Sequence, residues 1–479
     1  MKLLMNDPLF EYDIRGLLMA YYPWRDFVTD PETEDPEGLT VEYAPEKTAC
    51  RLVFETGEQV FEETVTLAEE RTEAKNQVKR ALYNILSKAN GDKRLPWGAL
   101  TGIRPVKLPM ADILEGKTRE ETVGHLKKDY LVSDEKAELA YEIAERELKL
   151  ISRVDTERGY SLYVGVPFCP TTCLYCSFTS YPIKKYETKV DDYLEALEKE
   201  LLWVSEHFKG RRPDTVYFGG GTPTTLDPEQ LKRLCGFIQD HFDLSGLLEW
   251  TVEGGRPDSI TKEKLEALKR FPVTRLSVNP QTMHQRTLDL IGRRHTVEDV
   301  LRAYELARET GFNNINMDLI VGLPGEDGKD VEETMDRIVS LNPENVTIHS
   351  LAIKRAARLN LEKSIYADMR MENSDEVMDM CRDKLKAIGL HPYYLYRQKN
   401  MAGNQENVGY AREGKEGIYN ILIMEEVESI LACGAGATSK RVRTENSLIT
   451  RAENVKNVDL YMQNIDEMIL RKEKLFSGD

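Results

Sequence analysis

The sequence predicts an α/β protein built around a partial barrel of six strand–helix repeats, with an α+β domain before it and a mostly helical domain after it. Between residues 156 and 355, short apolar runs alternate with helical patterns. The sequence before and after this region does not show the same alternation. Such alternation predicts parallel strands joined by right-handed crossovers. An open or partly closed barrel of the TIM type fits this pattern better than a doubly wound sheet does.

The predicted barrel strands are short and rich in apolar residues. They lie at residues 162–166, 215–218, 249–253, 275–279, 314–320 and 345–351. The clearest helix covers residues 191–208, where one apolar stripe is formed by Leu194, Leu197, Leu201 and Val204. In such barrels function gathers at the carboxyl ends of the strands, so residues at those ends are the first candidates.

Residues 1–155 are predicted to form a separate N-terminal domain. Residues 17–27 and 50–65 are rich in aromatic and β-branched side chains, which favours strands. Residues 71–88 carry apolar positions at helical spacing, and residues 118–151 are helical and strongly charged. Nothing in this region indicates chemistry, so we expect an accessory domain.

Residues 356–479 are predicted to form a C-terminal domain that covers the substrate. Residues 361–389 are mostly helical in pattern, and a helical tail closes the chain. Between them lie a tyrosine-rich segment at 391–397 and a glycine- and alanine-rich segment at 433–439.

Composition excludes several classes of protein. The 479 residues include 65 Lys and Arg against 82 Asp and Glu, a formal net charge of −17. Nucleic acids and anionic membranes attract positive proteins, so we expect neither as a partner. No apolar run approaches the roughly 18 residues of a membrane span, and Asp7 interrupts any signal-peptide core. We therefore expect a cytoplasmic protein.

Three of the seven cysteines stand close together. Cys169, Cys173 and Cys176 form a Cys-x₃-Cys-x₂-Cys motif, and the other four are solitary. Three thiolates can hold three corners of a four-iron cluster, which leaves one iron open to bind a small molecule. A structural zinc site would need a fourth ligand, and the next histidine, His207, lies beyond the start of a predicted helix.

Other unusual residues follow the predicted strands. The run Gly219-Gly-Gly-Thr-Pro223 offers bare backbone to a ligand, although such a run, taken alone, is more often a tight strand-to-helix turn. Glu253 ends the third strand. Asp318 is a charge within an apolar strand, where an unpaired acid is costly.

The cysteine motif after the first barrel strand resembles that of radical S-adenosylmethionine (SAM) enzymes. Its surroundings, Tyr163-Val-Gly-Val-Pro-Phe-Cys169 and Tyr175-Cys-Ser-Phe178, look like the oxygen-independent coproporphyrinogen III oxidase branch. The N-terminal domain and the segments at 98–108 and 391–400 resemble the HemZ-type coproporphyrinogen dehydrogenases. The resemblance covers nearly the whole chain.

The resemblance implies a [4Fe-4S] cluster on the three cysteines and SAM bound at its open iron. It identifies no catalytic side chain beyond the residues that hold these groups. The positions that match SAM-contacting residues of the family are Tyr163, Tyr175, Gly220, Gly221, Thr222, Glu253, Gln281, Arg293, Asp318, Ala352 and, in a segment linked with a second SAM, Thr438.

Two positions depart from the best-characterised branch. That branch has a histidine two residues after the position of Tyr163 and a fourth cysteine two residues after the last cluster ligand. This chain has Gly165 and Phe178 there. Formation of the cluster depends on neither position.

The activity that the resemblance implies is oxidative decarboxylation of coproporphyrinogen III to protoporphyrinogen IX. A 5′-deoxyadenosyl radical would abstract a hydrogen beside a propionate, and loss of an electron and carbon dioxide would leave a vinyl group. An electron donor such as flavodoxin or ferredoxin is implied, and we expect a monomer. Because the substrate carries four carboxylates, we expect basic contacts to it, for which the candidates are Lys354, Arg355, Arg358 and Arg397.

Three other functions stay open. Relatives in the same superfamily keep the cluster but carry haem as chaperones. Other radical SAM enzymes act on different substrates. A zinc-stapled binding protein without catalysis is the third alternative, and it differs in having no redox chemistry at its metal.

Overall fold

The computed structural model describes residues 1–23, 25–156, 158–354, 356–366, 369–398, 401–443 and 448–477. By internal contacts the chain divides into two units. The N-terminal unit is Met1–Glu145 with Leu395–Glu406, and the barrel unit is Arg146–Tyr394 with Asn407–Asp479. The three domains expected from the sequence, at 1–155, 156–355 and 356–479, remain a prediction.

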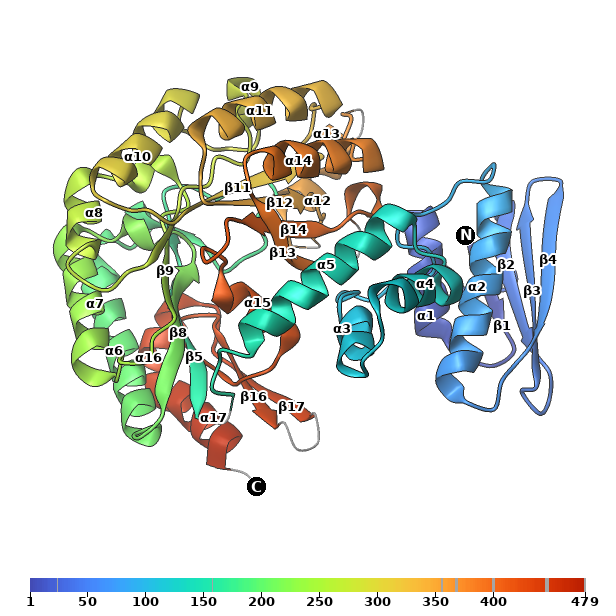
Figure 1. The fold of residues 1–479 in the computed structure, drawn as a ribbon, viewed down its shortest axis with the longest axis horizontal. Coiled ribbons are helices and arrows are strands. Elements are labelled where there is room, and N and C mark those ends of the chain that lie inside the picture. The colour runs from blue at the N-terminus through green and yellow to red at the C-terminus, as the bar shows by residue number, and fades with distance from the viewer. Residues whose placement is uncertain are drawn as a thin grey trace. The chain divides into compact units, whose positions relative to one another are not determined.

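The N-terminal unit combines a four-stranded sheet with helices. Its strands are β1 (Lys2–Met5), β2 (Glu37–Tyr43), β3 (Ala49–Thr56) and β4 (Gln59–Thr66), and its helices are α1 (Glu11–Tyr21), α2 (Arg71–Ala89), α3 (Lys107–Leu114), α4 (Arg119–Tyr130) and the first part of α5 (Asp134–Ile151). The sheet order is β1-β2-β3-β4, with β1 parallel to β2 and the other pairs antiparallel. An α+β unit is therefore present, as predicted (Figure 1).

The strand expected at residues 17–27 was wrong, because α1 covers its first part. The buried side chains of α1 are Ile14, Leu17, Leu18 and Tyr21. Their spacing is that of one helix face, and it outweighs the strand-like composition. The predicted strands at 50–65 and the helix at 71–88 agree with β3, β4 and α2.

The segment Leu395–Glu406 is held inside the N-terminal unit by buried charges. Arg397 is buried, and its Nη1 donates to the Leu100 carbonyl at 2.7 Å. The Lys136 ammonium pairs with Oε1 of Glu406 at 2.8 Å, and both side chains are buried. Part of the C-terminal sequence thus belongs structurally to the N-terminal unit.

The barrel unit is organised by one sheet of eleven strands in the order β13-β14-β12-β11-β10-β9-β8-β5-β15-β16-β17. The strands are β5 (Gly159–Val166), β8 (Arg212–Gly220), β9 (Glu249–Glu253), β10 (Arg275–Ser277), β11 (Ile315–Val321), β12 (Asn345–Ser350), β13 (His391–Tyr396), β14 (Asn407–Ala411), β15 (Ile430–Cys433), β16 (Thr438–Arg443) and β17 (Leu448–Glu453). From β5 to β12 the strands are parallel and follow chain order, as a barrel requires and a doubly wound sheet does not. Within the described chain the edge strands β13 and β17 do not pair, so the barrel is partial, as predicted.

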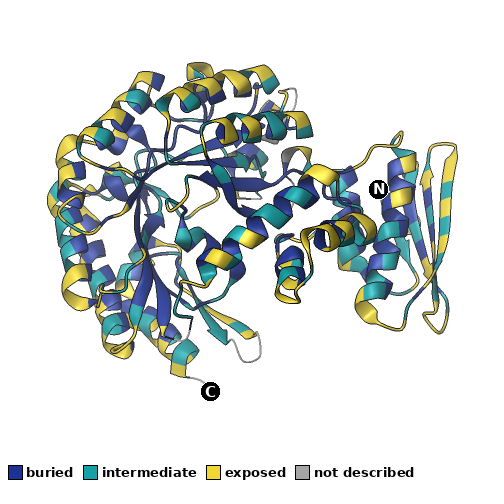
Figure 2. Ribbon diagram, viewed as in Figure 1, coloured by how far each residue is buried: buried dark blue, intermediate teal, exposed yellow. Residues whose placement is uncertain are grey.

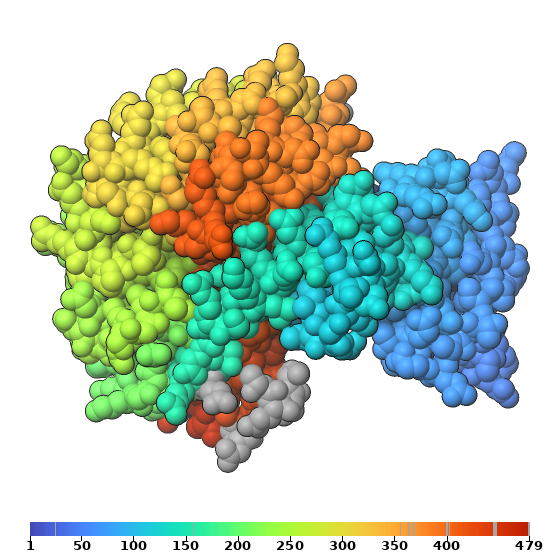
Figure 3. All heavy atoms as spheres, in the orientation of Figure 1, coloured from blue at the N-terminus to red at the C-terminus, as the bar shows by residue number. Residues whose placement is uncertain are grey.

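Most helices of the barrel unit cover the outside of the curved sheet, whereas α15 lies on its inner side (Figure 1). The helices of this unit are α6 (Val190–His207), α7 (Pro228–His241), α8 (Lys262–Leu268), α9 (Gln285–Leu290), α10 (Val297–Glu309), α11 (Gly328–Leu341), α12 (Arg358–Leu361), α13 (Lys363–Tyr366), α14 (Asp375–Ala387), α15 (Ile418–Glu425), α16 (Val458–Gln463) and α17 (Ile465–Ser477). In the space-filling view the barrel segments follow one another from green to orange in chain order (Figure 3). Among the described helices none is long and apolar enough to cross a membrane.

Three of the barrel helices, α7, α10 and α11, begin where the sequence caps them. The side chain before each helix and the third residue inside it satisfy each other's backbone N–H groups, which is a capping box. These pairs are Asp227 with Gln230 in α7, Thr296 with Asp299 in α10 and Asp327 with Asp330 in α11.

The C-terminal sequence contains more strand than the mostly helical domain expected. Strand β14 pairs antiparallel with β12, and β15 pairs parallel with β5. Both therefore extend the barrel sheet at opposite edges. These strands are short and their partners lie far away in sequence, so local patterns do not reveal them.

The two faces of the barrel strands differ in polarity. On one face, polar side chains bond across strands: Ser161 Oγ to Thr215 Oγ1 at 2.8 Å, and Asn345 Nδ2 to Asn314 Oδ1 at 2.6 Å. Alternate positions on the other face are apolar and fully buried, Trp250 among them. Strands β5 to β12 are mostly dark blue in Figure 2. The polar face is therefore buried as well, and its groups must be satisfied by one another or by ligands.

We predict that a buried ion pair holds the C-terminal helix to the barrel. Lys472 of α17 pairs with Glu200 of α6, and both side chains are buried. Replacing Lys472→Met leaves the Glu200 carboxylate buried without its cation, so we expect a loss of about 3–5 kcal/mol in the free energy of unfolding. Urea unfolding followed by circular dichroism measures this.

The matched control is Lys199→Met. Lys199 and Asp466 join the same two helices at 2.5 Å, but their side chains are 50% and 82% exposed. We expect this change to cost less than about 1 kcal/mol. Equal losses in the two variants would contradict the prediction.

Candidate functional site

The three clustered cysteines lie on one loop that is closed by a short strand pair. β6 (Phe168–Cys169) pairs parallel with β7 (Tyr181–Pro182), and the Tyr181 N–H donates to the Pro167 carbonyl at 2.8 Å. All three thiols are free of disulfides. The loop leaves the carboxyl end of β5, where a barrel places its chemistry.

Polar contacts anchor this cysteine loop to the neighbouring strand ends. The Thr171 hydroxyl donates to the Gly292 carbonyl at 2.9 Å and accepts from Nη1 of Arg256 at 2.6 Å. Arg256 is buried, and Asp258 holds its guanidinium through two bonds at 3.0 and 2.9 Å. The loop is therefore positioned by buried charge-assisted bonds.

The thiols lie in an environment that disfavours their ionised form. Burial raises the pKa of the Cys169 thiol to about 12 and also raises that of Cys176. The Cys169 sulfur lies 3.4 Å from Oγ1 of Thr222. Thiolates at these positions thus depend on the positive charge of a bound metal centre.

The donor set fits a cluster better than a single ion. A zinc ion draws four side chains around one point, whereas a four-iron cube takes each thiolate on a different iron. Within the described part of the chain, no three Cys, His, Asp or Glu side chains are arranged to hold a single ion. The zinc alternative therefore lacks its ligand group among these residues.

The glycine run after β8 crosses directly over the start of the cysteine loop. The Gly221 N–H donates to the Val166 carbonyl at 2.8 Å, and the Thr222 N–H donates to the Phe168 carbonyl at 2.7 Å. A Cβ on Gly221 would lie 2.5 Å from the Phe168 carbonyl oxygen, too close for any other residue. Gly220 has φ of +103°, which only glycine adopts easily. The crossing brings the predicted SAM-binding loop and the predicted cluster loop together.

Glu253 receives a hydrogen bond from a tyrosine that the sequence analysis missed. Tyr217 is one strand away, and its hydroxyl donates to Oε1 of Glu253. Burial raises the pKa of Glu253 to about 7, and the bond from Tyr217 counteracts that rise. The Tyr217 ring stacks on Tyr419, with centroids 4.3 Å apart, and on Tyr163 at 6.2 Å.

The signal for Tyr217 was present in the sequence. It precedes Gly219 by two residues, so it shares the inward face of β8 with the glycine run. Tyr419 carries no such signal, because α15 enters the site from a distant part of the chain.

Asp318 is not an unpaired acid. The Asn316 side chain donates to its Oδ1 at 2.7 Å, and Nε2 of His349 lies 3.8 Å from the same oxygen. Burial alone would raise the pKa of Asp318, but the hydrogen bond and charge of His349 outweigh it and hold the pKa below its usual value. The backbone carbonyl of Asp318 accepts the N–H of Gln281 at 2.9 Å, and Gln281 has φ of +70°.

Arg293 and its surroundings contain buried polar atoms without protein partners. Its Nη2 donates to the Asn279 and Gly255 carbonyls at 2.5 and 3.2 Å, and its Nη1 donates to the Tyr175 hydroxyl at 3.3 Å. Among the described residues, Arg293 Nε and Asn279 Oδ1 have no partner. Unsatisfied buried groups of this kind fit a polar ligand such as the amino acid end of SAM.

Two further positions predicted to contact SAM are Ala352 and Thr438. Ala352 follows β12 and is half-buried, and Thr438 begins β16. Thr438 lines a pocket of about 280 Å³ together with Tyr163 and Gly220. The structure thus brings Thr438 to two of the predicted SAM residues.

The four predicted substrate cations do not form one group. Lys354 is half-buried, and burial lowers its pKa. Arg358 is exposed, and its Nε pairs with Glu362 at 3.2 Å. Arg397 belongs to the N-terminal unit, where protein oxygens accept hydrogen bonds from its Nη1 and Nη2. Arg355 lies outside the described residues.

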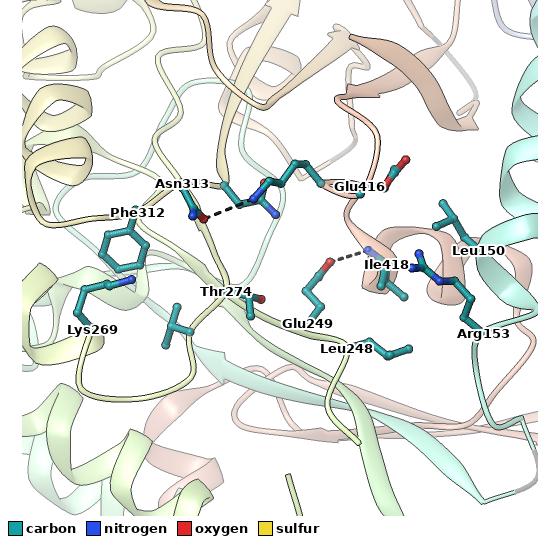
Figure 4. A pocket seen from close by; sticks show the side chains of 14 residues that line it. Leu150, Arg153, Leu248, Glu249, Lys269, Thr274, Phe312, Asn313, Glu416 and Ile418 are labelled. Carbon is teal, nitrogen blue, oxygen red and sulfur yellow. Dashed lines mark hydrogen bonds between the residues drawn. The ribbon is translucent and has the colours of Figure 1, made fainter. Parts of the chain in front are cut away.

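A second pocket, of about 410 Å³, opens at the amino ends of the barrel strands (Figure 4). Glu249 points into it and accepts the Ile418 N–H at 2.6 Å, while Lys415 donates to Asn313 at 3.5 Å. Its polar groups bond to one another, and barrels place stability rather than chemistry at this end. The candidate site is therefore the carboxyl end.

The comparisons with known proteins identify the superfamily and the family of the chain. The Radical SAM superfamily pattern matches residues 163–338. The oxygen-independent coproporphyrinogen-III oxidase-like protein HemZ of Bacillus subtilis is 41% identical over 429 residues, which cover 87% of this chain and 84% of that protein. Heme chaperone HemW of the same organism is 36% identical over 282 residues, covering 58% of this chain and 70% of that protein.

A solved structure supports the same fold. Coproporphyrinogen III oxidase (HemN) from Escherichia coli, described as a radical SAM enzyme, superposes with a TM-score of 0.52 at 26% identity. The match covers 67% of this chain and 72% of that one. Fold and cysteine loop thus define a radical SAM protein. Within that superfamily the chain belongs to the family of oxygen-independent coproporphyrinogen-III oxidase-like proteins represented by HemZ.

We predict that Gly221→Ala disrupts the cluster site. The added methyl group would meet the Phe168 backbone at 2.5 Å, and that backbone cannot move without displacing the cysteine loop. After anaerobic reconstitution we expect less than about half the iron and sulfide per chain of the unmodified protein. Gly236→Ala, in α7 with its nearest atom at 3.9 Å, should retain full content. Full content in both variants would refute the prediction.

We predict that Tyr217→Phe shifts the pH dependence of SAM binding. The change keeps the ring stack but removes the proton that stabilises the Glu253 carboxylate, so the pKa of Glu253 rises above about 7. A hydrogen bond to a charged group is worth ~1.5–3 kcal/mol, which corresponds to a rise of about one to two pH units. If the carboxylate contacts SAM, affinity near pH 7 falls and recovers at higher pH.

Equilibrium dialysis with labelled SAM on the reconstituted protein, from pH 6 to 9, measures this shift. The groups that also act on Glu253 are Asp318, Arg275 and His349, and the variant leaves all three in place. Tyr419→Phe is the control, because the structure describes no hydrogen bond from that hydroxyl. An unshifted profile in Tyr217→Phe would show that Glu253 does not titrate against SAM.

Proposed function

We propose that this protein is a radical SAM enzyme that oxidatively decarboxylates coproporphyrinogen III to protoporphyrinogen IX. The observation that carries the proposal is the cysteine loop crossed by the glycine run at the carboxyl end of a partial barrel. The 41% identity with the HemZ protein over 84% of its length supports the substrate.

The residues have the following roles in this proposal. Cys169, Cys173 and Cys176 hold a [4Fe-4S] cluster, and together with SAM that cluster supplies a radical able to abstract a hydrogen atom. Arg293 and the backbone of Gly221 hold the amino acid end of SAM. Buried walls around them exclude water from the reacting atoms.

The other proposed SAM contacts come from strands β8 to β12 or the residues just after them, from the cysteine loop and from β16. Glu253 and Asp318 offer carboxylates to hydroxyl or amino groups of SAM, and Tyr217 keeps the Glu253 carboxylate ionised and oriented. Tyr175, Thr222, Gln281 and Ala352 complete the proposed contacts, and Thr438 would contact a second SAM.

Each decarboxylation removes one hydrogen atom, one electron and carbon dioxide from a propionate arm and leaves a vinyl group. Two such events convert the substrate to the product. The electron passes to a one-electron acceptor. We further propose a cytoplasmic monomer that receives reducing electrons from flavodoxin or ferredoxin. Of the predicted substrate cations, Lys354 and Arg358 remain candidates in the barrel unit.

A chaperone that carries haem is the second candidate function. The 36% identity with Heme chaperone HemW over 282 residues supports it. Both candidates share the cluster loop and a tetrapyrrole ligand, and they differ in whether carbon dioxide is lost.

The deciding experiment uses anaerobically reconstituted protein with SAM, dithionite and coproporphyrinogen III. We expect vinyl products, with two molecules of 5′-deoxyadenosine per protoporphyrinogen IX. Cys173→Ser should form neither product, because one cluster corner is lost. If 5′-deoxyadenosine forms without vinyl products, the substrate is wrong. Stable haem binding and transfer without decarboxylation would instead establish the chaperone.

A further inference from the structure

The pocket of about 280 Å³ lies between the cysteine loop and the C-terminal strands of the barrel sheet. One wall is formed by residues 177–179, directly after the last cysteine of the motif. The opposite wall is formed by residues 435–438 and 453–456. Tyr163, Gly165 and Gly220 lie between the two walls. The pocket therefore adjoins the proposed SAM site and extends outward from it.

Phe178 presents an apolar ring at this pocket without a packing partner. It is 76% exposed, although it is one of the largest apolar side chains of the chain. It lies two residues after Cys176 and lines the pocket. A single exposed apolar residue is ordinary on a protein surface, but one that lines a pocket beside a cofactor loop suits a flat apolar ligand.

Two glycines, Gly165 and Gly220, lie with Tyr163 on the floor of the pocket. A Cβ on Gly165 would lie 3.1 Å from the Cys433 carbonyl, and a Cβ on Gly220 would lie 3.3 Å from the Tyr163 hydroxyl. Side chains at these positions would crowd the floor, so the glycines keep it open. A planar group can therefore approach closely.

The wall opposite Phe178 carries both charges and hydroxyls. The Lys456 ammonium is exposed and makes no ion pair with any residue that the structure describes. Glu453 lies on the same wall and is also exposed. Thr438 adds a hydroxyl group to this wall, and Thr179 adds one to the wall of Phe178. A ligand with an acidic arm would be attracted by Lys456 and repelled by Glu453.

This wall is rigid because a buried network holds it. The Glu200 carboxylate accepts the Gly434 N–H at 2.7 Å and the Asn454 side-chain amide at 2.7 Å. Lys472 pairs with Glu200 and donates to Oδ1 of Asn454 at 3.0 Å. The two segments of the wall are thus tied together before any ligand binds, which lowers the entropic cost of binding.

We propose that this pocket, in place of the second SAM suggested at Thr438, binds one pyrrole ring and the carboxylate arm of a tetrapyrrole. Phe178 stacks on the ring, and Lys456 pairs with the carboxylate. The size of the pocket suits one ring with its arm, and the rest of the macrocycle lies outside. This assignment rests on the tetrapyrrole ligand of the proposed function, and it presents one arm of the substrate to the neighbouring SAM site.

The test is a fluorescence titration of the reconstituted protein with coproporphyrin III, the stable oxidised form of the proposed substrate. Phe178→Ala should weaken binding roughly tenfold, because the stacking surface is lost. Lys456→Gln should weaken it about threefold, and Glu453→Gln should tighten it by a similar factor. Iron content and SAM affinity should stay at their original values in all three variants.

Leu470→Ala is the matched control, since Leu470 is an exposed apolar residue on α17 of the same unit and does not line the pocket. It should bind coproporphyrin III as the unmodified protein does. Unchanged affinity in Phe178→Ala would overturn the inference and leave the proposed decarboxylation standing. The protein could instead bind two SAM molecules per chain. If Phe178→Ala then loses one of them and still binds coproporphyrin III, the pocket belongs to SAM.

A parallel titration with haem separates the inference from the proposed function. If the protein binds haem but not coproporphyrin III, and Phe178→Ala weakens haem binding, the pocket assignment holds and the decarboxylase function fails. If neither tetrapyrrole binds, both are wrong.

Discussion

One backbone crossing organises the functional end of this protein. The chain leaving β5 passes beneath the glycine run that leaves β8, and two main-chain hydrogen bonds join them at Gly221 and Thr222. There is no room for a Cβ at Gly221, so the approach is as close as a polypeptide allows. The two loops predicted to hold the cluster and SAM thus share one fixed junction. This junction sets the spacing between the predicted cluster and the predicted SAM.

The barrel interior around this junction is polar, and that polarity has a cost. Buried carboxylates such as Glu253 and Asp318 would be strongly destabilising if left alone. Tyr217 on the adjacent strand donates to Glu253, while Asp318 is met by Asn316 of its own strand and by His349 of the adjacent strand. Among the described residues, buried polar atoms without a partner occur in several parts of the chain, and Arg293 Nε and Asn279 Oδ1 are two of them. These two lie where a bound cofactor would complete them.

The sequence predicted the elements that depend on neighbouring residues and missed those that depend on contacts between distant segments. The six barrel strands were predicted to within a few residues, because alternation of apolar runs and amphipathic helices is a local pattern. α1 was predicted as a strand because composition was weighed above the spacing of Leu17, Leu18 and Tyr21. Strands β14 and β15 were missed because each pairs with a partner distant in sequence. For the same reason Tyr419 could not be placed beside Tyr217.

The sequence by itself determined the cofactor class and the family, because three cysteines at fixed spacing after a strand form a ligand set that depends on few other residues. Only the tertiary structure decided which side chains are available to bind a ligand. It shows that Arg397 is buried in the N-terminal unit and that Phe178 and Lys456 face one pocket. Availability depends on burial and partners, and these arise from segments that meet only when the chain has folded.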